Sequence, residues 1–204
     1  MRVSKEKAAQ NRQNILTAAA RLFREQGVSA TGVDAITKDA SLTHGAVYSQ
    51  FGSKEAIAAE AIRLALRGSG CLWQRLVERK GAKQAFPAIV AAYLSRDHRD
   101  SPGQGCAVAA LGSEIARQSQ SVRDAFTEEL KAGLAFLAAV MPGEDSSGRY
   151  EDAIAAFAGM VGALILARAV NDEPLSDRIL QVTAERVTQS VKARKPAQRA
   201  QRSC

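Results

Sequence analysis

Apolar residues recur with a helical period in three segments near the start of the chain, and glycine or a tight break separates these segments. Between residues 7 and 26 the apolar positions fall at i, i+4, i+7 and i+8, which is typical of an amphipathic helix with a basic outer face. Gly27 stands where a glycine closes a helix. The same period predicts two shorter helices, one over about 32–40 and one that ends at Phe51. The chain is therefore expected to begin with one longer helix and two short ones.

Polar residues that cap helices mark where the short helices begin. Thr31 stands three residues before Asp34, an Asp variant of the capping box, and Thr43 can cap the next segment. Gly52 ends that segment, and Ser53 can cap a longer helix after it. Two short helices joined by a tight turn and braced by a longer helix form the helix-turn-helix pattern, although small bundles without a DNA-binding role share it.

The composition favours helices in the rest of the chain too. Of the 204 residues, 46% are hydrophobic and only 5% are aromatic. Alanine and leucine suit helices, whereas strands favour β-branched and aromatic residues, so we expect an all-α protein. Residues 53–79 are predicted to form a long helix that is broken or bent near Gly68 and Gly70. The later elements are predicted at these approximate positions: a helix over 82–97, a loop at 102–105, a helix to 119, a helix capped by Ser121 and running to 140, a loop over 141–148, and helices over 149–170 and 175–193.

The positive charge lies at the two ends of the chain. Residues 1–52 carry seven Lys and Arg against four Asp and Glu, and residues 186–204 carry six against none. A basic N-terminal module on a slightly acidic body suggests a nucleic-acid contact at that end. Residues 195–204 are interpreted as a disordered, solvated basic tail, with a specific DNA-binding arm as the alternative.

Cysteine usage and apolar runs indicate a cytoplasmic protein with no membrane partner. Cys71, Cys106 and Cys204 are odd in number and widely spaced, which fits a reducing compartment. The N-terminal residues are charged and polar where a secretory signal would need an apolar run, so no targeting peptide is expected. The longest apolar stretch, residues 153–167, holds fifteen residues, fewer than the ~20 that span a bilayer. It is predicted to be a helix buried against protein.

Two runs near the N-terminus resemble a known family. They are NRQNILTAAARLFREQG over residues 11–27 and TGVDAITKDASLTHGAVYSQFGSKE over residues 31–55. Both are similar to the N-terminal DNA-binding domain of TetR-family transcriptional regulators, and the similarity extends to about residue 60. Beyond it the chain resembles the family in its helical layout alone, apart from HRDSPGQGC over 98–106 with Ala110, Leu111 and Glu114, which is similar to one branch of the family's effector domains.

The resemblance places the DNA contacts on the third predicted helix and at the helix starts beside it. Gly45 would let the helix backbone approach a DNA edge closely, with a flexible first turn as the alternative. Tyr48 would donate its hydroxyl to a phosphate, unless the ring is simply buried. Four further residues would face the major groove by resemblance: His44, Ala46, Ser49 and Gln50. Three residues at helix starts would meet phosphates, although capping alone would explain the two threonines: Thr31, Thr43 and Lys54.

The resemblance also implies a pocket for a small-molecule effector of unknown identity. Apolar pockets and cores share a composition, so core packing is as good an explanation for each aromatic residue. Glu114 would supply polar selectivity. The predicted pocket residues are Trp73, Phe86, Tyr93, Cys106, Glu114, Phe126, Phe136 and Met160.

His98 and Cys106 raise a metal-binding or nucleophilic alternative for the loop between them. They are eight residues apart, no second Cys or His is near, and zinc needs at least three protein ligands. A connector between helices, with Cys106 as a small buried hydrophobic residue, is the favoured interpretation. We expect no metal, no cofactor and no catalytic residue.

Small residues near the C-terminus resemble the family's four-helix dimer interface. They repeat at i+4 in the helix from 153 and leave a smooth face for another helix; a buried helix in a monomer is the alternative. The predicted interface residues are Ala155, Gly159, Gly162, Ala163, Leu166, Ile179 and Val187.

These features predict a helix-turn-helix DNA-binding domain over 1–53, an effector-binding and dimerisation domain over 54–194, and the tail over 195–204. The resemblance implies a homodimeric, ligand-responsive repressor that binds a near-palindromic double-stranded DNA operator. One alternative is a helical small-molecule-binding protein or enzyme whose N-terminal helices only pack. Another keeps DNA binding but has no effector.

Overall fold

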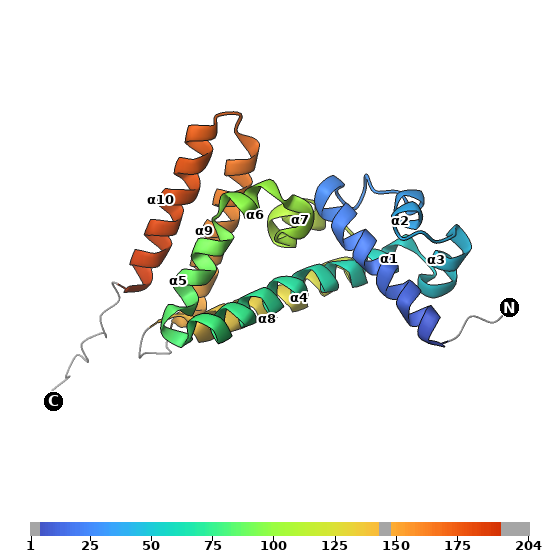
Figure 1. Cartoon of the computed structure of the whole chain (residues 1–204), viewed down its shortest axis with the longest axis horizontal. Coiled ribbons are helices and arrows are strands. Elements are labelled where there is room, and N and C mark those ends of the chain that lie inside the picture. Colours follow the sequence, from blue (N-terminus) through green and yellow to red (C-terminus); the bar gives the residue numbers. More distant parts are fainter. Residues whose placement is uncertain (1–4, 143–147, 193–204) are drawn as a thin grey trace. The chain divides into compact units, whose positions relative to one another are not determined.

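The computed structural model describes residues 5–142 and 148–192, and in these ranges the chain is helical with no strand (Figure 1). The all-α prediction is confirmed. The first helices are α1 (Lys5–Gln26), α2 (Val33–Asp39) and α3 (His44–Phe51). The later elements are α4 (Lys54–Lys80), α5 (Ala82–Tyr93), α6 (Arg96–Asp100), the 3-10 turn η1 (Pro102–Gln104), α7 (Ala107–Ile115), α8 (Gln120–Val140), α9 (Arg149–Ala169) and α10 (Glu173–Lys192). The predicted tail and most of the predicted loop over 141–148 lie outside the described residues.

Long helix α4 runs unbroken through Gly68 and Gly70, so a break there is wrong, and a bend, the other form of the prediction, stays a prediction. A glycine inside a helix costs about 1 kcal/mol relative to alanine, too little to interrupt the hydrogen-bond ladder of a 27-residue helix. No neighbouring atom lies within 4 Å of where a Cβ would stand at either glycine, so no packing contact explains the missing side chains.

Two predicted helix boundaries differ from the structure. The helix expected over 82–97 ends at Tyr93, and α6 begins separately at Arg96. Between them Ser95 donates its hydroxyl to the Ala92 carbonyl at 2.9 Å, which offers the backbone an alternative to continuing the helix. Ser121 lies inside α8 and does not cap it, because its hydroxyl donates to Glu55 Oε1 at 2.5 Å.

The described chain divides into two compact units. The first unit contains the residues up to Leu72 together with 97–133, and the second contains 73–96 together with the residues from Leu134 on. This division differs from the predicted boundary at residue 53, because α7 and the first part of α8 share a buried core with α1, α2 and α3. Each unit is described separately below.

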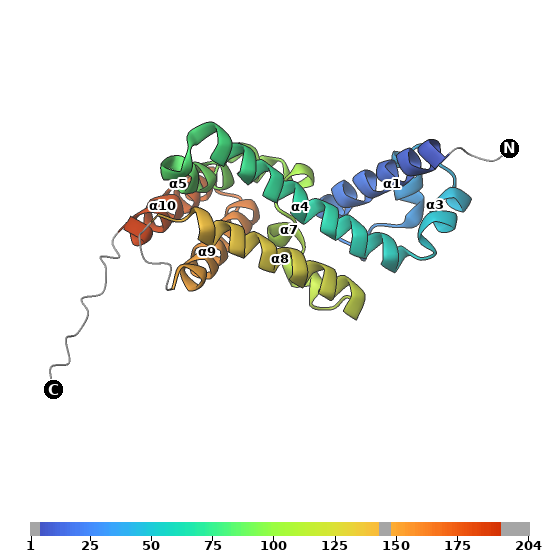
Figure 2. The same cartoon turned by 90° about the horizontal axis from the view of Figure 1, so that it is seen from below.

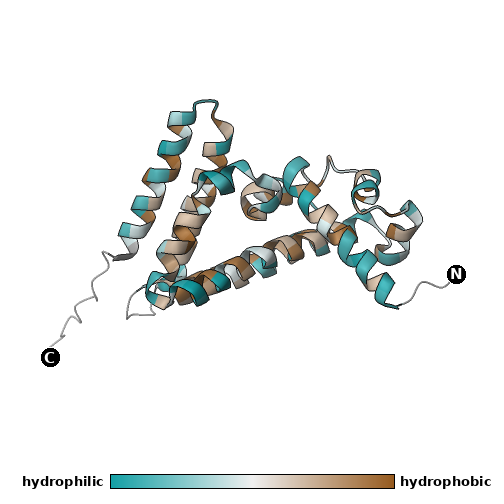
Figure 3. Cartoon of the chain, viewed as in Figure 1, coloured by the Kyte–Doolittle hydropathy of each residue, from teal (hydrophilic) through white to brown (hydrophobic). Residues whose placement is uncertain are grey.

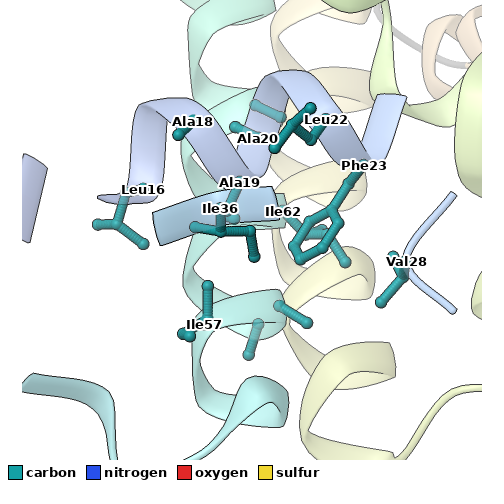
Figure 4. Close-up of a cluster of buried hydrophobic side chains, with 14 of the residues drawn as sticks. Leu16, Ala18, Ala19, Ala20, Leu22, Phe23, Val28, Ile36, Ile57 and Ile62 are labelled. Atoms are coloured by element: carbon teal, nitrogen blue, oxygen red, sulfur yellow. The ribbon is translucent and has the colours of Figure 1, made fainter. Parts of the chain in front are cut away.

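The core of the first unit forms around the middle of α1. Figure 3 shows hydrophilic residues at both ends of this helix and hydrophobic residues along its middle. Phe23, Ile36 and Ile62 are each 1% exposed or less, and their side chains converge in Figure 4. Leu111 on α7 joins the same cluster at 2% exposure. Burial of side chains of this size stabilises a fold by about 1.5–3 kcal/mol each, so the first unit is held largely by this cluster.

The second unit is held by helix packing and an aromatic cluster. Helices α9 and α10 lie side by side (Figures 1 and 2). Ser176 is buried and donates its hydroxyl to the Ala167 carbonyl at 2.6 Å, which fixes the start of α10 against the end of α9. Phe157 is in edge contact with the rings of Trp73 at 5.9 Å and Tyr93 at 5.8 Å. Such pairs add about 0.5–1.5 kcal/mol beyond the area they bury.

Among the described residues, α9 is the one helix whose length and composition would allow it to cross a membrane. This is weak evidence, since core helices of soluble proteins pass the same test. One face of α9 is buried within the second unit, through Ala153, Ala156, Phe157, Met160, Ala163, Leu164 and Ala167.

Candidate nucleic-acid interface

Helices α2 and α3 are joined by a tight turn. Ser41 adopts a φ of 55°, a left-handed conformation that costs a non-glycine residue roughly 1–2 kcal/mol. The Leu42 N–H donates to the Thr37 carbonyl at 2.9 Å, which offsets part of that cost. The turn fixes α3 at a defined angle to α2, as a helix-turn-helix requires.

Helix α3 is anchored through its inner face. Val47 has no exposed surface and Phe51 is 9% exposed. The Arg12 guanidinium lies 4.4 Å from the centre of the Phe51 ring and donates two hydrogen bonds of 2.6 Å to Glu60. Its bond to Glu60 raises the pKa of Arg12. Arg12 therefore ties α3 to both α1 and α4, a role that no local sequence pattern indicated because Arg12 and Glu60 are 48 positions apart.

The outer face of α3 presents the residues that the sequence predicted there. The His44 side chain is 50% exposed and Tyr48 is 45% exposed, so the simple burial of Tyr48 is excluded. Gly45 and Ser49 are exposed, while Ala46 and Gln50 are half-buried. A Cβ at Gly45 would meet no atom within 4 Å, so nothing in the chain itself requires a glycine at this position. The arrangement leaves a polar, accessible helix face.

Thr43 and Ser53 cap helices as predicted. The Ala46 N–H donates to Thr43 Oγ1 at 3.3 Å at the start of α3. The Ala56 N–H donates to Ser53 Oγ at 3.1 Å at the start of α4. Thr43 is exposed, so its hydroxyl stays accessible while it caps.

The capping box predicted at Thr31 is wrong. The N-cap of α2 is Gly32, which has no side-chain cap. Thr31 is fully buried and its hydroxyl donates to the Gly27 carbonyl at 2.7 Å, so this side chain cannot reach a phosphate. Asp34 Oδ1 instead lies 2.5 Å from His44 Nε2, and the His44 ring lies 5.5 Å from that of Tyr48. Asp34 thus belongs to the outer face, which the sequence analysis missed.

Lys54 is the first residue of α4 and lies half-buried beside the loop between α1 and α2. Its Nζ donates to the Ser29 carbonyl at 3.3 Å. An ammonium group has three donors, so this bond leaves capacity for a phosphate. The intramolecular bond keeps the positive charge near the start of the helix-turn-helix.

The predicted effector residues fall into the two different units. Trp73, Phe86, Tyr93 and Met160 are buried in the second unit, where Phe136 lies 6.3 Å from the Trp73 ring. The three remaining residues, Cys106, Glu114 and Phe126, belong to the first unit.

Contacts within the first unit correct the role predicted for Glu114. The Glu114 carboxylate accepts from the backbone N–H groups of Val28 and Ser29, so it does not supply selectivity to a pocket. Cys106 is 4% exposed and its N–H donates to His98 Nε2 at 2.9 Å, which fits the connector interpretation.

No group of three or more His, Cys, Asp or Glu side chains in the described residues is placed to hold a metal ion. A surface hollow of about 430 Å³ contains none of the predicted effector residues; its lining is Arg96, Glu173, Pro174, Asp177, Arg178 and Gln181.

The predicted dimer residues are partly exposed and partly buried. Ala155, Gly159 and Leu166 are exposed on α9, and Gly162 and Ile179 are half-buried. Ala163 and Val187 are only 5% and 8% exposed, because they pack inside the second unit, and their place at an interface stays a prediction. The structure adds Ile154 and Ile165, each 44% exposed, to the outer face of α9.

The turn between α2 and α3, the anchored inner face of α3 and its polar outer face define a helix-turn-helix protein of the DNA-binding class. In a comparison with known proteins, residues 15–61 match the sequence model of the bacterial regulatory proteins, tetR family. Over this N-terminal region the chain is similar to the DNA-binding domain of TetR-family transcriptional regulators. A curated relative, the HTH-type transcriptional regulator AcrR of Shigella flexneri, is 44% identical over 59 residues. That match covers 29% of this chain and only 27% of the relative.

Solved structures share the fold over nearly the whole chain. A TetR-family regulator from Cytophaga hutchinsonii has a TM-score of 0.75 at 19% identity, over 96% of this chain and 100% of its own. The reduced form of NemR from E. coli has a TM-score of 0.70 at 21% identity, over 88% of this chain and 96% of its own. The C-terminal helices, which the family sequence model does not cover, therefore also have the fold of these proteins.

Proposed function

We propose that this protein is a cytoplasmic, homodimeric transcriptional repressor that binds a near-palindromic DNA operator and is released by a small-molecule effector. The observation that supports it most directly is the accessible polar face of α3, held outward by buried Val47 and Phe51, within the region that matches the family. Gln50 would pair with adenine, His44 would contact a base edge or phosphate, and the Ala46 methyl would touch thymine. Tyr48, Thr43 and Lys54 would hold phosphates, and Gly45 would admit the DNA edge.

The proposed dimer uses the outer face of α9. Ile154, Ile165 and Leu166 are 44%, 44% and 56% exposed, and exposed Ala155 and Gly159 lie on the same helix. Two-fold association buries the same patch on both protomers, and the small residues allow close helix approach. Two heads reach successive major grooves when their recognition helices lie ~34 Å apart.

The proposed effector binds among the aromatic residues of the second unit. Trp73, Tyr93 and Phe136 are the predicted pocket residues that gather there, in ring contact with one another or with Phe157. An effector that favours a conformer with the wrong head spacing weakens DNA binding, and DNA weakens effector binding by the same factor.

An anisotropy titration with duplex DNA from the flanks of the coding gene tests the proposal. Sequence-selective binding that weakens with salt is expected, because Lys and Arg contacts release counterions from DNA. No binding at low salt, or binding with no sequence preference, would favour a helical protein whose N-terminal helices only pack. Unchanged melting across a ligand library would favour a regulator with no effector.

A further inference from the structure

The segment from His98 to Gln118 makes contacts with the end of α1 that the proposed DNA contacts do not explain. The Glu114 carboxylate accepts from the Val28 N–H at 2.9 Å and from the Ser29 N–H at 2.6 Å. Gln118 Nε2 donates to Ser29 Oγ at 3.2 Å and to Glu114 Oε1 at 3.3 Å. Glu114 on α7 and Gln118 just after it thus both bind the start of the loop between α1 and α2. This segment, Val28 and Ser29, is called the corner below.

Gly27 allows Glu114 to bind the corner. Its φ of +90° is a left-handed conformation that favours glycine. A Cβ at this position would come within 2.7 Å of Glu114 Oε2. Any side chain at Gly27 would therefore displace the carboxylate from the two N–H groups it accepts.

A second contact joins α1 to the turn before α7. Arg24 donates from Nε at 2.8 Å and from Nη2 at 2.5 Å to the carbonyl of buried Gly103. His98 Nε2 accepts the Cys106 N–H at 2.9 Å and so holds the two ends of this loop together. The motif HRDSPGQGC therefore builds the surface that receives Arg24.

The first contact is charge-assisted. Burial opposes the ionisation of Glu114, but the side chain and N–H of Ser29, the N–H of Val28 and the charge of Arg117 together hold its pKa below the ordinary value. A carboxylate that accepts backbone N–H groups forms stronger hydrogen bonds than a neutral acceptor does.

We propose that Glu114 is a positioning residue for DNA binding, which fixes the corner at Val28 and Ser29 from which the helix-turn-helix begins. This inference rests on the proposed function. The corner leads directly into α2, and Lys54 holds the Ser29 carbonyl from the other side. Because the corner is held by both Glu114 and Lys54, α7 sets the orientation of α2. The turn between α2 and α3 then passes that orientation on to α3.

Hydrogen–deuterium exchange on the full-length protein tests the contact without DNA. The variant is Glu114→Gln, and its matched control is Glu128→Gln, which removes an exposed ion pair with Arg63 in the same unit. In Glu114→Gln, exchange of a peptide over 24–31 is expected to rise roughly tenfold or more at Val28 and Ser29, since charge-assisted bonds are lost. Exchange elsewhere in the first unit stays unchanged. Equal acceleration throughout that unit would show a general stability role and overturn the inference.

The same variants are then titrated with the duplex from the flanks of the coding gene. Glu114→Gln is expected to bind about tenfold more weakly, and Glu128→Gln within about twofold of the original chain. Equal affinities for the two variants would overturn the inference while leaving the proposed function intact. Failure of the unsubstituted chain to bind selectively would overturn the proposed function itself, and with it the positioning role.

Discussion

At the scale of single residues, the contact between Asp34 and His44 affects the face of α3 that is proposed to meet DNA. The Asp34 side chain is 92% exposed and carries a negative charge on the face proposed to meet a polyanion. The same carboxylate holds the His44 imidazole in place through its contact with Nε2.

Replacement Asp34→Asn is predicted to increase affinity for unrelated DNA while reducing preference for the operator. The added affinity follows from removing a repulsive charge, and the loss of preference, at most about fivefold, from releasing His44. Competition binding with operator and unrelated duplexes measures the ratio. The control is Asp39→Asn, which removes another carboxylate of α2, one that pairs with Arg21 on α1. An unchanged ratio in Asp34→Asn would show that orientation of His44 does not contribute to selectivity.

Lys54→Ala is predicted to weaken DNA binding equally for all sequences. A lost phosphate contact lowers the slope of log affinity against log salt by roughly 0.9. Tyr48→Phe is expected to weaken binding in the same sequence-independent way but with the slope unchanged, since a hydroxyl carries no charge. Anisotropy titrations at several salt concentrations separate the two. If both variants bind as the original chain does, the N-terminal helices only pack.

The charge on Glu114 predicts how stability depends on pH. Its pKa is held below the ordinary value of 4.5, so ionised Glu114 stabilises the fold above that pH, and the stabilisation is lost as the pH falls through the lowered pKa. The melting temperature of the original chain should therefore exceed that of Glu114→Gln at neutral pH, and the difference should shrink in acid below 4.5. Thermal melts from about pH 7 to pH 3 measure this; a constant difference would contradict the assignment.

At the scale of helices, the sequence predicts what is local and misses what is distant. Gly27, Gly52, Thr43 and Ser53 were correctly placed at helix ends, since capping depends on residues a few positions apart. The contact between Glu114 and Val28 joins residues 86 positions apart, so no periodicity or spacing could indicate it. Thr31 was misplaced for a different reason, because a local alternative competes with capping: its hydroxyl donates to the Gly27 carbonyl four positions earlier instead of accepting an N–H at the start of α2.

Two glycines give opposite predictions for replacement by alanine. Gly27→Ala forces a side chain into a φ of +90° and against Glu114, and should destabilise the protein by about 1–2 kcal/mol or more. Gly68→Ala lies in the interior of α4 with open space around the new methyl group, and should stabilise by about 0.5–1 kcal/mol. Urea unfolding measures both. Equal effects of the two substitutions would mean that the local backbone conformation at Gly27 is not required.

At the scale of the whole molecule, the sequence could give the aromatic residues of the proposed effector site only as a set of apolar positions. Trp73, Phe86 and Met160 have the composition of a core and of a pocket alike, and the sequence cannot separate these. The structure shows them buried in the second unit, while it assigns Glu114 and Cys106 to the unit that contains the helix-turn-helix. The division into units depends on the packing of α7 and α8 against α1, α2 and α3, which are distant in the sequence. Helix propensity cannot predict such packing.

The outer face of α9 yields the prediction that tests the assembly. Leu166 is 56% exposed, and in a two-fold interface each protomer buries the same patch, so Leu166→Glu places a charge on both sides of it. Light scattering should show the original chain at twice its 21.7 kDa mass and the variant at that mass. Because a dimer holds both half-sites at once, the variant should also lose on the order of a hundredfold in operator affinity. Leu72→Glu, at 49% exposure on α4, is the control and should stay dimeric. A Leu166→Glu protein that still dimerises would exclude this face as the interface.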